Sequence, residues 1–458
     1  MTAREWLRLM LVGLGASVVP LDTAVNIAFP DITHSFGLPI RMIQWVVICY
    51  VLTYASLMLA FGRVGDIFGH TRVFRAGLLW SIAAFLACAA APAYGWLLFC
   101  RFLQGIGAGL VISVAPALIT GLFPEDRRGR AVAAFTMMFA LGSAAGPLIG
   151  GTLVSLWGWP AVFWFRAPIA LAALVFLRGL PAQPRTGARD LLDVAGAFLL
   201  ALTLSSLLLF INQLPRIARH AWLAIVLLAV ALAGLGGFIR REARAAAPII
   251  DLRFFRSAGF AAVNLASVLI YLTSFSVLLF VPYYLVRFIA LPLPAAGAVL
   301  AASFAGTIAA SALAGRLIER IPANFVALLG AVLGGAGLAV IGGWDAVPGQ
   351  MPEILAALVL QGFGVGLFQV AYLDVVLGTI PGRNRGVAGG VAMLTRTLGI
   401  VGGATLLTLG FQAVTAAALA NGHDAGAAFL AAFHTVFRVA GVVSAATGIA
   451  ALAARPRR

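Results

Sequence analysis

Ionisable side chains inside long apolar stretches are the first candidates for chemistry in this sequence. Asp22 and Asp374 are the clearest acids in such stretches, and Arg101 and Arg396 are basic residues in the same setting. A charge is costly in hydrocarbon, so an ionisable residue there usually has a function. A carboxyl group in a low-dielectric environment can bind and release a proton as its access to water changes. We therefore expect Asp22 to carry a proton, with Asp374 as the second candidate.

Each of these residues also has a structural alternative. Asp22 could be the permanently charged partner of a buried arginine, and Arg101 could hydrogen-bond backbone carbonyl groups. Asp374 lies near the end of its apolar stretch, where its carboxylate could reach headgroups or pair with a loop. Arg396 could neutralise an acid, hold an anionic group of a ligand, or serve the structure only.

The elements that carry these residues are expected to be apolar helices. The chain has 458 residues, of which 62% are hydrophobic and only 10% are charged, whereas about 25% of a typical soluble chain is charged. Runs of roughly 20 apolar residues, long enough to cross a bilayer, follow one another along the sequence. The composition thus predicts an all-α integral membrane protein. The net charge of +16 comes from arginines in short loops, which indicates membrane orientation and not nucleic-acid binding.

Charged and Pro/Gly-rich breaks divide the chain into fourteen predicted spans. The spans cover residues 7–29, 43–62, 73–91, 96–120, 130–154, 160–179, 193–213, 221–239, 258–286, 295–314, 324–343, 353–379, 386–412 and 428–454. Most arginines then lie on one side of the membrane, so the positive-inside rule places both termini in the cytoplasm. The arginine- and alanine-rich composition is consistent with a GC-rich bacterial genome, and we expect a bacterial inner membrane.

Two distant segments have nearly the same sequence. Leu103-Gln-Gly-Ile-Gly-Ala-Gly-Leu110 matches Leu360-Gln-Gly-Phe-Gly-Val-Gly-Leu367, and both predicted spans head inward. A parallel repeat of this kind pairs two bundles about an axis along the membrane normal. We predict a six-helix bundle over residues 1–180, two inserted helices over 181–249 and a second six-helix bundle over 250–458. Bundles that rock against each other expose a central site alternately, so this organisation predicts a transporter.

Several motifs connect the sequence to a known family. Gly62-Arg-Val-Gly-Asp66-Ile-Phe-Gly69-His-Thr-Arg72 resembles the loop signature of the major facilitator superfamily, and Arg101-Phe-Leu-Gln-Gly105 resembles the motif of its fourth span. Gly142-Ser-Ala-Ala-Gly146-Pro147-Leu-Ile-Gly150-Gly151 resembles its antiporter motif. The segment Leu21-Asp22-Thr-Ala-Val-Asn26-Ile-Ala-Phe-Pro30, together with the fourteen predicted spans, makes the chain similar to the fourteen-helix drug/proton antiporters.

The resemblance implies roles in conformational change and proton movement. The loop residues Gly62, Asp66, Gly69 and Arg72 would form a latch for the outward-facing state, in which glycines allow a tight turn and Asp66 pairs with Arg72 or caps a helix. In proton-coupled members, the resemblance suggests that Arg101 influences proton movement.

The antiporter motif adds four gating candidates. They are Gly142, Gly146, Pro147 and Gly150. Small residues one turn apart let helices pack closely, and a proline bends its helix. In this superfamily the full motif points to export.

Aromatic side chains in the spans could line an apolar cavity and attract flat cations. The candidate substrate-binding residues are Asn26, Trp45, Phe139, Phe275, Phe368, Tyr372 and Arg396. Arg166 stands where the family usually has an asparagine, which bears on the charge of the substrate. We expect Arg166 and Arg438 to extend toward lipid headgroups.

These features predict a proton-driven exporter of lipophilic cationic or zwitterionic drugs that works by alternating access. The alternative is a dedicated exporter of an endogenous lipid, siderophore or natural product on the same scaffold. The sequence has no hydrolase motif, phosphate loop or metal-ligand spacing, so we expect no enzyme activity, cofactor or metal. The expected partners are a small lipophilic substrate, protons and the bilayer, with no nucleic acid, and we expect a monomer.

Overall fold

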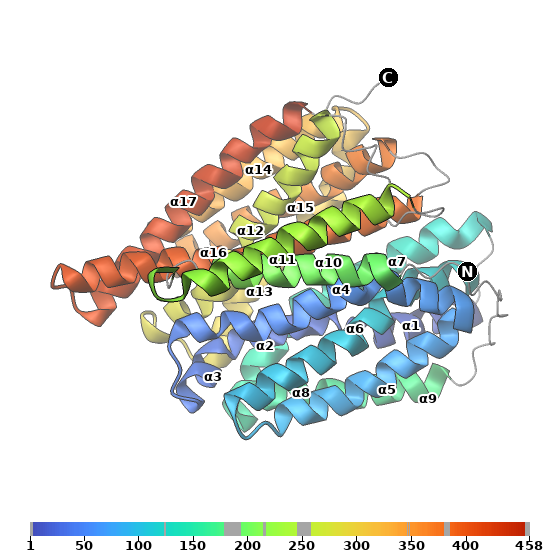
Figure 1. The fold of residues 1–458 in the computed structure, drawn as a ribbon, viewed down its shortest axis with the longest axis horizontal. Coiled ribbons are helices and arrows are strands. Elements are labelled where there is room, and N and C mark those ends of the chain that lie inside the picture. Colours follow the sequence, from blue (N-terminus) through green and yellow to red (C-terminus); the bar gives the residue numbers. More distant parts are fainter. Residues whose placement is uncertain are drawn as a thin grey trace. The chain divides into compact units, whose positions relative to one another are not determined.

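All the regular secondary structure in the part described by the computed structural model of the protein is helical (Figure 1). That part comprises residues 3–122, 125–177, 194–213, 217–244, 258–345, 347, 349–379 and 385–453. Within it, eleven helices are long and apolar enough to cross a membrane, so the chain is a multi-pass membrane protein. Three shorter apolar helices, Leu141–Trp157, Ala161–Phe176 and Phe198–Leu207, overlap further predicted spans. The predicted count of fourteen spans is therefore not confirmed by helix length and composition.

Two compact units make up the chain. The first contains Met1–Leu204 and Pro292–Gly297, and the second contains Ser205–Leu291 and Ala298–Arg458. The domain boundaries predicted at residues 180 and 249 both lie outside the described residues. The division into two six-helix bundles and an inserted pair stays a prediction.

Prolines break the first apolar stretch of unit one into short helical pieces. The helices up to residue 213 are α1 (Ala3–Ser17), η1 (Pro20–Thr23), α2 (Ala24–Ile27), α3 (Phe29–Ser35), η2 (Ile40–Met42), α4 (Gln44–Phe68), α5 (His70–Ala89), α6 (Tyr94–Leu122), α7 (Glu125–Trp157), α8 (Ala161–Trp164), α9 (Arg166–Phe176) and α10 (Val194–Gln213). Pro20 and Pro30 each lie in the first turn of a new piece, where the missing N–H is tolerated. Asp22 consequently lies in a single 3-10 turn, η1, between α1 and α2.

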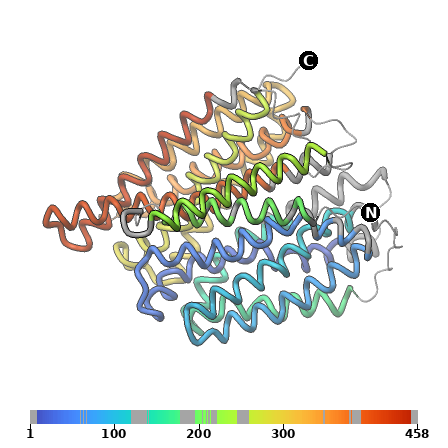
Figure 2. Tube along the Cα trace, viewed as in Figure 1, coloured from blue at the N-terminus to red at the C-terminus, as the bar shows by residue number. Residues whose placement is uncertain are grey.

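The second half of the chain has longer uninterrupted helices. They are α11 (Ile217–Glu242), α12 (Ala258–Arg287), α13 (Leu293–Ile318), α14 (Ala323–Ile341), α15 (Met351–Thr379), α16 (Arg385–Ala420) and α17 (Ala425–Ala453). Figure 2 shows the path of the chain as a tube along the Cα trace, coloured from blue at the N-terminus to red at the C-terminus. A core of aliphatic and aromatic side chains, including Phe260, Leu367 and Phe368, is buried among α12, α13, α14, α15 and α16.

The repeated segment packs in the same way in both units. In α6, Gly105 and Gly109 lie against α4, and the glycine between them lies against α5. In α15, Gly362 and Gly366 lie against α13, and the glycine between them lies against α14. An added Cβ would meet backbone or side-chain atoms of the neighbouring helix at each of these positions. The repeat in the sequence therefore corresponds to a repeated three-helix packing, α4–α5–α6 and α13–α14–α15.

Candidate functional site

The glycine face of α7 holds the segment that carries Asp22. An added Cβ on Gly146 would meet Thr23 Oγ1 and would lie 2.8 Å from the backbone N of Ala24. At Gly150 an added Cβ would lie 2.9 Å from the backbone O of Ala24. Thr23 Oγ1 also donates a hydrogen bond to the backbone O of Ser143 at 2.8 Å. The predicted antiporter motif thus brings α7 into backbone contact with η1 and α2, as small residues at this spacing allow.

One carboxylate and two guanidinium groups meet in unit one. Arg101 Nη1 lies 2.7 Å from Asp22 Oδ1 and Arg101 Nη2 lies 2.9 Å from Asp22 Oδ2, so this pair is bidentate. Arg166 Nη1 donates to the same Oδ1 atom at 2.7 Å. We call Asp22, Arg101 and Arg166 the charged triad. Its side chains are 13%, 1% and 0% exposed, respectively, so it lies in a region that largely excludes water.

All the polar nitrogens of Arg101 have hydrogen-bond partners. Besides its two bonds to Asp22, Arg101 donates from Nε to the backbone O of Val46 at 2.8 Å and from Nη1 to Gln104 Oε1 at 2.9 Å. Gln104 Nε2 donates in turn to Asp22 Oδ1 at 2.9 Å. The guanidinium carbon lies 4.3 Å from the centroid of the Tyr50 ring, within cation–π range. The backbone contact predicted as the structural alternative for Arg101 is present, alongside the ion pair.

Arg166 corrects one expectation from the sequence. It was expected to extend toward headgroups, but it begins α9 and its side chain is fully buried. Its guanidinium carbon lies 4.4 Å from the centroid of the Phe85 ring, and its Nη1 bonds to Asp22. The reason is electrostatic, because a buried carboxylate offers a charge partner that a headgroup would otherwise supply. Its Nε and Nη2 are buried and have no hydrogen-bond partner.

The charged triad carries one more positive than negative charge when Asp22 is ionised. Both guanidinium groups stabilise the ionised carboxylate, and three donors converge on Oδ1. In the structure Asp22 is therefore paired with buried arginines, which is the structural alternative that the sequence suggested for it. For Asp22 to bind a proton, at least part of this pairing must be released. Its role in proton coupling stays a prediction.

The remaining residues predicted for unit one lie at several places. Asn26 is buried in α2 and donates to the backbone O of Thr23 at 3.2 Å, one turn from Asp22. Trp45 of α4 and Phe139 of α7 are half-buried. Pro147 lies within α7 without ending it.

The predicted latch lies at the junction of α4 and α5. Gly69 separates the two helices with φ at 92°, in the region that favours glycine. Gly62 has open space beside it, and the side chain of Arg72 is exposed. The side chain of Asp66 lies outside the described part of the chain, so its pairing with Arg72 stays a prediction.

Among the residues predicted for unit two, Tyr372 belongs to a buried polar group with Asn264 and Thr395. Tyr372 Oη donates to Asn264 Oδ1 at 2.9 Å and lies 3.0 Å from Thr395 Oγ1. The Phe368 ring stacks on the Tyr372 ring with their centroids 6.0 Å apart, and Phe275 is buried. Arg396 is half-buried and its guanidinium carbon lies 5.5 Å from the Tyr271 ring centroid. Asp374 is exposed near the end of α15.

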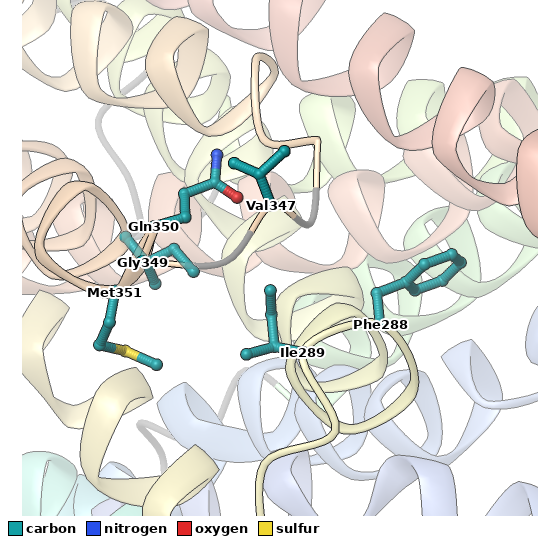
Figure 3. A pocket seen from close by; sticks show the side chains of 7 residues that line it. Phe288, Ile289, Val347, Gly349, Gln350 and Met351 are labelled. Carbon is teal, nitrogen blue, oxygen red and sulfur yellow. The ribbon is translucent and has the colours of Figure 1, made fainter.

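A small pocket in unit two lies where the end of α12 approaches the start of α15 (Figure 3). Its volume is about 270 Å³. Its lining includes Phe288, Ile289, Val347, Gly349, Gln350 and Met351. None of the predicted site residues lies in this lining. No group of three or more metal-ligating side chains occurs among the described residues.

Comparisons with known proteins point in one direction. A family model described as Major Facilitator Superfamily matches residues 10–240 and 263–458. The chain is 31% identical over 452 residues to a probable actinorhodin transporter of Streptomyces coelicolor, covering 92% of this chain and 75% of that protein. It is 28% identical over 402 residues to multidrug resistance protein Stp of Mycobacterium tuberculosis, covering 87% of this chain and 74% of that protein.

A solved structure has the same fold. It is a bacterial homologue of the human lysosomal transporter Spinster, in an inward-facing and occupied conformation. The TM-score is 0.74 at 15% sequence identity, and the match covers 100% of this chain and 98% of that chain. At this identity the likeness concerns the fold alone.

Proposed function

Because the chain belongs to the major facilitator superfamily, and is thus a membrane transporter and not an enzyme, we propose that it is a proton-coupled antiporter. It exports lipophilic cationic or zwitterionic drugs from the cytoplasm by alternating access. The observation that carries the proposal is the charged triad, in which a largely buried acid is paired with two arginines. The full antiporter motif, packed directly on the segment that carries Asp22, supports export.

Proton and substrate would compete at Asp22. A cationic group of the substrate is attracted by the ionised carboxylate, and a proton that binds the carboxylate removes that attraction. Binding of one ligand then weakens binding of the other by the same factor, which is the thermodynamic condition for exchange. Arg101 and Gln104 would retain the carboxylate in place between the two events. Asp374, Asn26, Trp45, Phe139, Phe275, Phe368, Tyr372 and Arg396 keep the proton-coupling and substrate-binding roles proposed from the sequence.

A dedicated exporter is the second candidate function, and one finding favours it. The relative that is 31% identical is named a probable actinorhodin transporter, and a natural product is the cargo that the alternative names. The name of Stp supports the multidrug proposal in the same way. Breadth of substrate, not mechanism, separates the two.

The proposed membrane arrangement follows the sequence. All fourteen predicted spans cross a bacterial inner membrane with both termini in the cytoplasm, as the arginine distribution indicates. Residues 1–180 and 250–458 would form the two bundles that rock, and the chain would act as a monomer.

Uptake into everted membrane vesicles tests this function. Wild-type vesicles with an acidic lumen should accumulate rhodamine B or its ethyl ester, and an uncoupler should abolish accumulation. Asp22→Asn should not accumulate either dye. The double variant Asp22→Asn/Arg166→Gln, in which one cation is removed with the acid, should also be inactive, because it too lacks the titratable carboxyl group. Arg438→Lys is the matched control, because Arg438 is an exposed arginine in unit two. This variant should be active.

Accumulation that is indifferent to the uncoupler would contradict proton coupling. Movement of neither dye, with gradient-driven movement of one natural product, would favour the dedicated exporter.

A further inference from the structure

The two arginines of the charged triad differ in how their hydrogen-bond donors are used. Arg101 donates from Nε, Nη1 and Nη2 to Val46, Gln104 and Asp22. Arg166 donates only from Nη1, while its Nε and Nη2 are buried without a partner. Buried polar groups are almost always hydrogen-bonded, so an unfilled donor of this kind calls for an explanation.

The unfilled donors of Arg166 lie on one edge of its guanidinium group. Nε–H and Nη2–H point in parallel from the same side of the planar group, whereas Nη1 is directed at Asp22. Two parallel N–H donors match the two oxygens of a carboxylate, which is the bidentate geometry that makes arginine selective for planar anions. We call the Nε–Nη2 side of Arg166 the free edge.

The charge of the triad favours the same ligand. Two guanidinium groups face one carboxylate, and among the described residues no second carboxylate lies within ion-pair distance of either. A simple cation would meet a net positive charge, and a neutral acceptor would leave that charge uncompensated. An acidic group on the free edge would balance the charge and fill both donors, without displacing Asp22 from Nη1.

We propose that the free edge of Arg166 binds an acidic group of the cargo, so that the transporter selects compounds with a carboxylate or similarly planar oxyanion, zwitterions foremost. The proposal rests on the proposed export function and narrows its substrate class from cations and zwitterions to zwitterions. The acidic group of the cargo pairs with Arg166, and its cationic group faces Asp22, where the proton competes. Because the free edge is closed over by protein in this structure, the site must open to admit the cargo.

Two matched pairs of probes test the selection. Rhodamine B has a free carboxyl group and its ethyl ester does not, and pyrene carboxylic acid and its methyl ester differ in the same way. Equilibrium binding to the purified full chain in lipid nanodiscs at neutral pH, followed by probe fluorescence, requires no proton gradient. The wild type should bind each acid about ten- to a hundredfold more tightly than its ester, the range for charge-assisted hydrogen bonds.

Variants of Arg166 separate selection from structure. Arg166→Gln should weaken binding of the acids much more than binding of the esters, so that the ratio of the two affinities falls toward one. The ester binding that remains reports that the protein is folded. Arg166→Lys, which retains the charge but not the parallel donors, should restore part of the preference. Arg438→Lys should behave as the wild type. If Arg166→Gln binds no probe, the lysine variant decides, and a lysine variant with the full preference of the wild type would overturn the role of the free edge.

The remaining outcomes have defined meanings. Equal binding of acid and ester in both pairs, or binding of no probe by the wild type, overturns the proposal and leaves water as the occupant of the free edge. An acid preference that depends on Arg166, together with transport that ignores the proton gradient, would support this inference and contradict antiport. Gradient-driven transport without any acid preference would support antiport and contradict this inference.

Discussion

At the scale of single residues, the charge imbalance of the triad makes its members unequal. Asp22 is the only carboxylate among the three, whereas each arginine is one of two cations. Removing the acid leaves two buried cations facing each other, but removing Arg166 leaves a balanced bidentate pair between Asp22 and Arg101. The three side chains should therefore contribute very differently to stability.

Thermal unfolding of the purified protein in detergent should rank the triad variants. Asp22→Asn should lower the melting temperature most, since leaving a buried charge without its partner costs about 3–5 kcal/mol. Arg166→Gln should have a smaller effect. The double variant should melt above Asp22→Asn alone, because it removes one of the two uncompensated cations. Additive losses in the double variant would show that the two charges do not interact.

At the residue level, the sequence points to individual charges within apolar spans, and the structure shows which of them meet. Arg101 and Asp22 were singled out because each is a charge within an apolar run, and the structure joins them. Arg166 lies in an equally apolar run, Phe163 to Leu174, so the same signal was present. Its partner is 144 residues away, and helical periodicity cannot tell which distant acid a helix end will face. The nearness of Arg166 to a predicted span end favoured the headgroup interpretation instead.

At the scale of helices, close packing of glycine faces decides where the acid lies. The face of α7 formed by Gly146 and Gly150 touches the backbone of α2, which leaves no room for a side chain between the two elements. The sequence predicted close packing here, because the ten-residue motif has the required small residues. It could not identify the partner, which is a property of the folded chain.

Alanine at position 146 tests this packing. Gly146→Ala should lower stability by about 1–3 kcal/mol, as expected for overpacking, and should reduce transport, because the added Cβ meets Thr23 and Ala24. Gly410→Ala is the matched control in α16, where nothing lies within 4 Å of an added Cβ. That variant should be as stable as the wild type or slightly more stable, since alanine favours helix. Equal effects of the two substitutions in unfolding and transport assays would refute the packing argument.

The two glycines of the predicted latch should respond differently to alanine. Gly69 has φ at 92° between α4 and α5, so Gly69→Ala should destabilise the protein by about 1–3 kcal/mol through backbone strain. Gly62→Ala should leave the melting temperature unchanged, because the space beside Gly62 is open. If Gly62→Ala lowers the transport rate at unchanged stability, Gly62 makes its close contact in another conformation, as the latch role predicts. A stable Gly69→Ala variant would contradict the argument from φ.

At the scale of the whole molecule, the sequence predicted the class and the repeat more securely than the number of crossings. Apolar composition alone identified a multi-pass membrane protein, and the equivalent glycines of α6 and α15 make equivalent contacts. In the described part of the chain, eleven helices meet the requirements of length and composition. The three shorter apolar helices leave the count open, because proline breaks and short apolar windows make helix length a poor measure of crossing.

Reporter fusions at two positions test the crossings of α10 and α11. If both helices cross the membrane, alkaline phosphatase fused after residue 215 should be active outside the cytoplasm, and green fluorescent protein fused after residue 250 should fluoresce inside it. Fluorescence of a fusion after residue 458 should report the C-terminus in the cytoplasm, as the arginine distribution predicts. Cytoplasmic signals at both residues 215 and 250 would show that neither helix crosses and would reduce the span count by two.

The separation of the triad along the chain also has a consequence for biosynthesis. Asp22 is 79 residues from Arg101 and 144 residues from Arg166. Synthesis from the N-terminus therefore delivers the acid to the membrane well before either of its cations leaves the ribosome. Until α6 is inserted, the first span must keep its carboxylate in contact with water, with the translocation machinery or with a proton. The final arrangement around Asp22 can form only after α9, which supplies Arg166, has been made.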